Sequence, residues 1–113
     1  QVAWQVELAV KPGALDRFRA LTREMVAFTQ GEPGVLRYER FISPDGAVIH
    51  IYERYADSAA AVAHLRAFSR EFSGRFLDLV QRTRFTVYGT PSTELRDILD
   101  GFGATYLEPL GGF

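Results

Sequence analysis

The spacing of the apolar residues constrains the fold most, because it changes repeatedly along the chain. The first segment places an apolar residue at every second position, at Val2, Trp4, Val6, Leu8 and Val10. This alternation is typical of a β-strand with one buried face. From residue 14 to residue 30 the spacing becomes three or four, which predicts an amphipathic helix. The "KPG" at 11–13 separates the two segments.

The same two spacings return in the middle of the chain. Strand patterns at 35–43 and 47–56 flank "PDG", which is typical of a tight hairpin turn. A second helix is expected to start at Asp57 or Ser58, because a short side-chain oxygen can accept from free N–H groups of the first turn. Its apolar positions continue for more than five turns, and residues 69–74 are expected to interrupt or bend it.

A further strand pattern at 82–89 places Thr83, Phe85 and Val87 on one face. The element order is therefore βαββαβ. With right-handed crossovers, this order predicts an α+β fold of the ferredoxin-like type, an antiparallel sheet with two helices on one face. We expect this domain to cover residues 1–90.

Residues 91–113 form a C-terminal extension with its own signals. Ser92 or Thr93 is expected to begin a short helix, and Gly101 is expected to end it. The extension is rich in apolar residues, among them Leu95, Ile98, Leu99, Phe102, Tyr106, Leu107, Leu110 and Phe113. We therefore expect this helical tail to pack on its own domain or on a partner subunit.

Composition limits the classes of partner. The chain contains 13 Lys and Arg residues and 14 Asp and Glu residues. Because the basic residues are scattered along the sequence, we expect no nucleic-acid binding. The absence of cysteine excludes disulfides and Cys-type zinc sites, and the two histidines lack metal-ligand spacing, so we predict no metal site. No apolar run reaches a membrane span and no signal-peptide pattern opens the chain, so we expect a cytoplasmic protein with no membrane contact. Because the sequence opens at Gln1 without Met, we expect that residues precede it.

His64 is the candidate catalytic residue. It lies about two turns into the second predicted helix, at the edge of the apolar side marked by Val62, Leu65 and Phe68. A histidine with its ordinary pKa near 6.5 can act as a base or hydrogen-bond partner toward a ligand in a pocket between helix and sheet. A structural histidine bonded to a nearby oxygen remains the alternative interpretation.

Aromatic side chains supply candidates for substrate binding. A cavity suited to a planar ligand could be lined by Trp4, Tyr38, His50, Tyr52, Phe68 and Phe72. Residues of this kind are also typical of a core, and His50 could instead line a dimer interface. Arg40 and Arg54 could bind an anionic oxygen of a ligand, or they could pair with Glu39, Glu53 or Glu7 across the sheet. Carboxylates could come from Asp57, Glu53 and Glu7, although nothing in their spacing requires it. No G-x-G-x-x-G or Walker pattern is present, so we expect no nucleotide or flavin cofactor.

Three segments resemble the antibiotic biosynthesis monooxygenase family: "VKPG" after the first strand pattern, T-x-x-E-P-G-x-L-x-Y at 29–38, and "YERYADSAAAVAHL" at 52–65. The resemblance covers about residues 2–89. It implies a dimeric α+β barrel built from two ferredoxin-like subunits.

The same resemblance implies a class of reaction. Some members of the family are cofactor-independent monooxygenases of phenolic polyketides, others act on quinols or degrade haem, and one group isomerises a phosphorylated sugar-like signal. We therefore expect a monooxygenase that uses molecular oxygen on an aromatic, quinol or polyketide-like molecule. Haem-degrading members carry a Trp near the position of His64, and this departure counts against haem. A non-catalytic small-molecule-binding or stress-associated dimer, or an isomerase using His64 as acid/base, remain alternatives.

The predicted sheet leads to a first prediction, a homodimer. The face opposite Trp4 carries Ala3 and Ala9, and the 47–56 strand has aliphatic or aromatic residues on both faces. A second apolar face needs a second cover, and another copy of the chain is the simplest one. We expect an interface larger than about 1,000 Å². Light scattering should therefore find a dimer, and a stable monomer at micromolar concentration would contradict this prediction.

Overall fold

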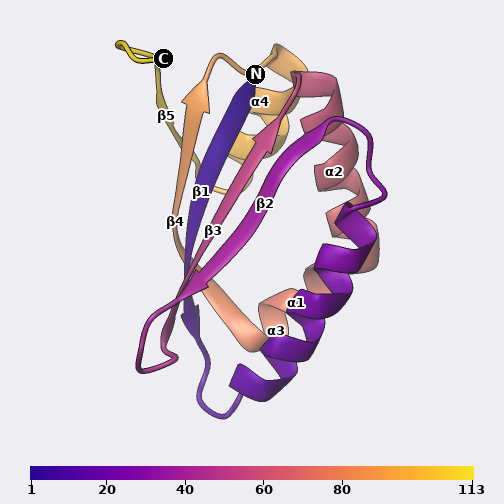
Figure 1. Ribbon diagram of the computed structural model, residues 1–113, viewed down its shortest axis with the longest axis vertical. Coiled ribbons are helices and arrows are strands. Elements are labelled where there is room, and N and C mark those ends of the chain that lie inside the picture. The colour runs from indigo at the N-terminus through magenta and orange to yellow at the C-terminus, as the bar shows by residue number, and fades with distance from the viewer.

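A computed structural model describes all 113 residues as a five-stranded sheet with helices packed on one face (Figure 1). The elements are β1 (Val2–Val10), α1 (Leu15–Thr29), β2 (Val35–Ile42), β3 (Val48–Tyr55), α2 (Ser58–Glu71), α3 (Ser73–Leu79), β4 (Val80–Gly89), α4 (Thr93–Asp100) and β5 (Thr105–Leu107). The predicted ferredoxin-like α+β fold is confirmed in its first four strands. None of these helices is both long and apolar enough to cross a membrane.

The strand order is β2-β3-β1-β4-β5. The first four strands pair antiparallel, as predicted. The prediction of a wholly antiparallel sheet is wrong at one edge, where β5 of the extension pairs parallel to β4 through Thr86 and Thr105. After α4 the chain turns back and runs alongside β4, so the extension adds a strand as well as a helix.

The core lies between the helices and one face of the sheet. Trp4, Leu8 and Tyr55 are among the largest fully buried side chains, and the Trp4 and Tyr55 ring centroids lie 4.8 Å apart. Val2 and Val6 share this face of β1, as the alternation predicts. Burial of this kind stabilises a fold by roughly 1.5–3 kcal/mol for each large side chain.

The second helix begins and breaks where the sequence indicates. Asp57 is its N-cap, and its carboxylate accepts a hydrogen bond from the Ala60 N–H at 2.8 Å. The helix is interrupted at Phe72, which has φ of −129° and separates α2 from α3. The break turns the Phe72 ring onto Phe28, at 5.3 Å between centroids.

A β-bulge in β4 overturns one predicted face. Glu7 pairs with Arg84 and Leu8 pairs with Arg82, so Thr83 has no opposite residue in β1. The Thr83 hydroxyl donates to the Glu7 carbonyl oxygen at 3.0 Å instead of facing the core with Phe85. Because the extra residue shifts the alternation by one, Arg82 faces the helices.

The extension packs on its own domain through its helix. Ser92 caps α4 by accepting from the Leu95 N–H, and Leu95 and Leu99 are fully buried. Packing of the last residues on a partner subunit, the other expected position, stays a prediction. Leu110 and Phe113 are fully exposed on this chain.

The burial of α4 gives a prediction with a matched control. Leu95→Ala should lower the free energy of unfolding by about 2–5 kcal/mol, because it opens a cavity in the core. Leu77→Ala removes the same atoms from an exposed position of α3 and should change the free energy of unfolding much less. Denaturant unfolding of both variants measures the difference. Equal stabilities for the two variants would contradict the packing of α4.

Candidate functional site

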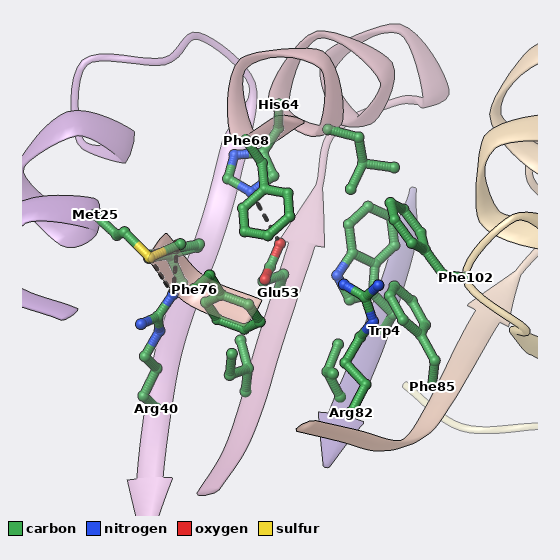
Figure 2. Close-up of a pocket in the computed structure, with 14 residues that line it drawn as sticks. Trp4, Met25, Arg40, Glu53, His64, Phe68, Phe76, Arg82, Phe85 and Phe102 are labelled. Carbon is green, nitrogen blue, oxygen red and sulfur yellow. Dashed lines mark hydrogen bonds and ion pairs between the residues drawn. The ribbon is translucent and has the colours of Figure 1, made fainter. Parts of the chain in front are cut away.

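A cavity lies between the sheet and the helices, beside His64 (Figure 2). Every strand except β5 contributes to its wall, together with α1, α2, α3 and one residue of the extension. The lining is Trp4, Val6, Met25, Tyr38, Arg40, Ile51, Glu53, His64, Leu65, Phe68, Phe76, Arg82, Phe85 and Phe102. The cavity volume is about 40 Å³, far below the roughly 300–1,000 Å³ of typical ligand pockets. A ring-sized ligand therefore enters only if lining side chains move.

His64 is held between two carboxylates. Its Nδ1 lies 2.8 Å from Oε1 of Glu32, and its Nε2 lies 3.2 Å from Oε1 of Glu53. Glu32 belongs to the turn after α1, which packs closely on α2. Gly34 in this turn has φ of +82°, and a Cβ there would lie 2.7 Å from the Cβ of Ala60. Position 34 therefore requires a glycine, because the turn lies so close to α2. The same close contact brings Glu32 to the imidazole ring.

Both carboxylates favour the protonated ring. Burial alone would lower the pKa of His64, but the hydrogen bonds and negative charges of Glu53 and Glu32 outweigh burial and raise the pKa above its usual value. Both ring nitrogens lie within hydrogen-bond distance of a carboxylate oxygen, and a ring that donates from both nitrogens is an imidazolium. A protonated ring accepts no proton, so the geometry favours a carboxylate as the proton acceptor of this site.

Glu53 is the carboxylate that reaches the cavity. It is buried, and its Oε1 accepts a hydrogen bond from the Tyr55 hydroxyl as well as contacting His64. Burial disfavours its charge, but the hydrogen bond and positive charge of His64 outweigh burial, so the pKa of Glu53 is lowered. None of these contacts uses Oε2, which leaves one oxygen available to a ligand (Figure 2).

Arg40 occupies the side of the cavity near α1. Its guanidinium donates to Oγ1 of Thr22 at 2.9 Å, to the Tyr38 hydroxyl at 2.9 Å and to Sδ of Met25 at 3.3 Å. Its Nε is buried without a hydrogen-bond partner. Burial raises the pKa of Tyr38 to about 12, so this hydroxyl stays neutral.

Arg82 occupies another part of the wall (Figure 2). Its guanidinium carbon lies 4.6 Å from the ring centroid of Phe102, which belongs to the extension. Burial lowers the pKa of Arg82 without abolishing its charge. The site thus contains three cations, Arg40, His64 and Arg82, and two carboxylates, Glu32 and Glu53. This balance favours a ligand with negative charge, or a reaction in which negative charge develops.

A sequence model of the family described as antibiotic biosynthesis monooxygenase matches residues 2–82. The chain belongs to this family. A comparison with curated proteins finds no match.

Solved structures share the fold of this antibiotic biosynthesis monooxygenase family member. MupZ from Pseudomonas fluorescens is 23% identical with a TM-score of 0.83, over 99% of this chain and 92% of its own. Rv0793 from Mycobacterium tuberculosis is 26% identical with a TM-score of 0.69, over 80% of this chain and 95% of its own. PA3566 from Pseudomonas aeruginosa is 22% identical with a TM-score of 0.61, over 76% and 87%. The first match thus includes nearly the whole of this chain, and the other two leave about a fifth or more of it unmatched.

The structure of this family member brings together only part of the predicted site. Trp4, Tyr38, Phe68 and His64 line the cavity. His50, Tyr52 and Phe72, which were also predicted to bind substrate, are not among its lining residues.

Strand alternation and the helix break explain why these three lie elsewhere. His50 and Tyr52 alternate with Ile51 and Glu53 in β3 and face the opposite side of the sheet. On that side Nδ1 of His50 lies 3.2 Å from Nε2 of Gln5, and its Nε2 lies 3.5 Å from the Glu7 carboxylate. Phe72 packs on Phe28 at the helix break.

Two charged residues of the site, Glu32 and Arg82, were not predicted as site residues from the sequence. Glu32 carries a weak signal, because the E-P-G turn places a carboxylate beside a glycine that must approach a helix. Arg82 carries none, because the bulge that turns it inward leaves no mark in the apolar spacing. The structure contains no group of three or more His, Cys, Asp or Glu side chains arranged to hold a metal ion.

The carboxylate–imidazolium cluster predicts a dependence of stability on pH. Stability that comes from the raised pKa of His64 is present below its unfolded pKa of about 6.5 and is lost as the pH rises through the folded pKa. Stability that comes from the lowered pKa of Glu53 is present above its unfolded pKa and is lost as the pH falls through the folded one. The free energy of unfolding should therefore fall on both sides of neutral pH.

His64→Gln should remove the alkaline part of this dependence and lower the free energy of unfolding at neutral pH by about 3–5 kcal/mol. His50→Gln, at a half-exposed histidine, is the matched control and should preserve the alkaline fall. Denaturant unfolding across a pH series measures both. An unchanged alkaline slope in His64→Gln would show that the ring is not held as a cation.

Proposed function

We propose that the protein is a cofactor-independent monooxygenase that oxidises an aromatic, quinol or polyketide-like molecule in the cavity beside His64. One observation carries the proposal: a free carboxylate oxygen of Glu53 faces an aromatic cavity that also holds three cations. Membership in the antibiotic biosynthesis monooxygenase family supports the class of reaction. The mechanism needs a proton acceptor, stabilisation of the substrate anion and exclusion of water.

In the proposed reaction the substrate hydroxyl gives its proton to Oε2 of Glu53. Because the lowered pKa makes Glu53 a weak acceptor, the anion must be stabilised by the cations of the cavity, above all by His64 and Arg40. His64 is therefore assigned an electrostatic role and keeps its proton. This replaces the role of base that the sequence suggests.

The oxidation then uses only electrons of the substrate. The substrate anion transfers one electron to molecular oxygen, and the substrate radical and superoxide combine to a peroxide anion. The proton held on Glu53 passes to this peroxide, which loses water and leaves a carbonyl group. One oxygen atom stays in the product, the other leaves as water, and the substrate has lost two hydrogen atoms. Exclusion of water by the bound ligand would keep superoxide beside the radical.

We also propose that the protein acts as a homodimer. Large apolar residues are exposed on the face of the sheet opposite the core, where register pairs Phe41 with His50, Val48 with Ala9, and Tyr88 with both Ala3 and Leu107. The fully exposed Leu110 and Phe113 follow directly. A second copy of the chain seated on this face would cover them.

Oxygen uptake with a panel of hydroquinones and hydroxynaphthalenes tests the proposal. Glu53→Gln should reduce turnover by about 10²–10⁴, because the amide accepts no proton at this oxygen. Glu39→Gln, at an exposed carboxylate of β2, should retain wild-type turnover.

Thermal melting of the same preparations separates a catalytic loss from unfolding. Binding without oxygen uptake would favour a small-molecule-binding protein over an oxygenase. Conversion of a bound compound to an isomer without oxygen uptake would favour an isomerase. Full turnover in a folded Glu53→Gln variant would refute the role of Glu53.

A further inference from the structure

We propose that Arg82 binds a carboxylate group of the ligand, so that the substrate of this site is an aromatic acid. This inference rests on the proposed function only for the place where the ligand binds. The ligand carboxylate would serve for recognition, because the oxygenation itself does not require it.

A β-bulge in β4 directs the Arg82 side chain into the cavity. In an uninterrupted ladder, Thr83 would share a face with Phe85 and Arg82 would point to the other side of the sheet. The bulge at Thr83 reverses this, and Arg82 lines the cavity while Thr83 bonds the Glu7 carbonyl. Bulges often occur where a side chain is re-aimed beside a site.

The Arg82 guanidinium lacks the partners that Arg40, the other arginine of the cavity, has. Arg40 donates to three acceptors. Arg82 is half-buried and forms no ion pair and no side-chain hydrogen bond. A partly desolvated charge without a counter-ion is unfavourable, and a ligand anion would relieve this cost.

An aromatic column holds the guanidinium in position. Phe102 stacks on Phe85 with an interplanar angle of 3° and 5.7 Å between centroids, and Phe85 packs on Trp4, also at 5.7 Å. The Arg82 guanidinium carbon lies 4.6 Å from the centroid of Phe102, the ring at one end of this column. A stacked guanidinium keeps its N–H edge free, and this edge matches the two oxygens of a carboxylate.

The arrangement also separates the two ends of the ligand. Figure 2 shows Arg82 beside Trp4 and Phe85, whereas Arg40 and Met25 lie on the far side of Glu53. A planar ligand could thus place its acid group at Arg82 and its reacting hydroxyl at Glu53. Phe102 lies in the extension, beyond the residues that the family model matches, so this end of the cavity depends on the extension.

Binding of a matched pair of probes tests the inference. We would use 1,4-dihydroxy-2-naphthoate and its methyl ester under anaerobic conditions, so that no oxidation occurs. Trp4 is the single tryptophan and lines the cavity, so its fluorescence reports binding. We expect the wild-type protein to bind the acid at least about tenfold more tightly than the ester, as for a hydrogen bond to a charged group.

Variants of two arginines on the same strand provide the comparison. Arg82→Gln should lose the preference for the acid and leave the affinity for the ester unchanged, and Arg82→Lys should recover only part of the preference. Arg84→Gln is the matched control, because Arg84 is exposed and lies near Glu7 instead of the cavity. It should behave as wild type. Circular dichroism checks that each variant is folded.

Three results would overturn the inference: equal affinity of the wild type for acid and ester, no binding of either probe, or equal losses in Arg82→Gln and Arg84→Gln. The proposed oxygenation is judged separately by oxygen uptake. If the wild-type protein binds the acid more tightly but consumes no oxygen, this inference holds and the proposed function fails. If it oxidises both probes and binds them equally tightly, the proposed function holds and this inference fails.

Discussion

The contact of His64 with two glutamates is the interaction on which the site depends. It joins three segments distant in the sequence: the turn after α1 through Glu32, β3 through Glu53, and α2 through the ring itself. The buried Glu53 and the partly buried Glu32 would otherwise repel each other, and the imidazolium between them offsets this repulsion. The same contact leaves one oxygen of Glu53 free, and the chemistry of the cavity follows from that oxygen.

The site shows how one residue can be essential without being the group that reacts. A histidine among apolar residues suggests a base, since its ordinary pKa lies near neutrality. The neighbours of His64 raise its pKa, and carboxylates at both ring nitrogens favour the positively charged form. Its effect on a bound molecule would then be electrostatic, and the group that exchanges a proton would be the carboxylate it holds in place.

The fold could be predicted almost entirely from the sequence, because spacing, caps and breakers act locally. The Asp57 cap and the break at Phe72 are examples. The site could be predicted only in part. Trp4 and His64 lie on faces that the spacing defines, whereas Arg82 depends on a bulge and Glu32 on the approach of a turn to a distant helix. Both depend on contacts between remote segments, as does the parallel pairing of β5, and no local pattern encodes such contacts.

The short strand β5 has a consequence for the behaviour of the sheet in solution. Without it, the ten residues of β4 would present a row of unpaired backbone groups at one edge, and such edges recruit strands from other molecules. The three residues of β5 pair with Thr86, Val87 and Tyr88, so this strand covers the C-terminal part of that edge and leaves residues 80–85 of β4 unpaired on this side. At the opposite edge, β2 carries the charged Arg37 and Glu39, which discourage strand addition. The extension that supplies Phe102 to the cavity thus also shortens the open edge of the sheet.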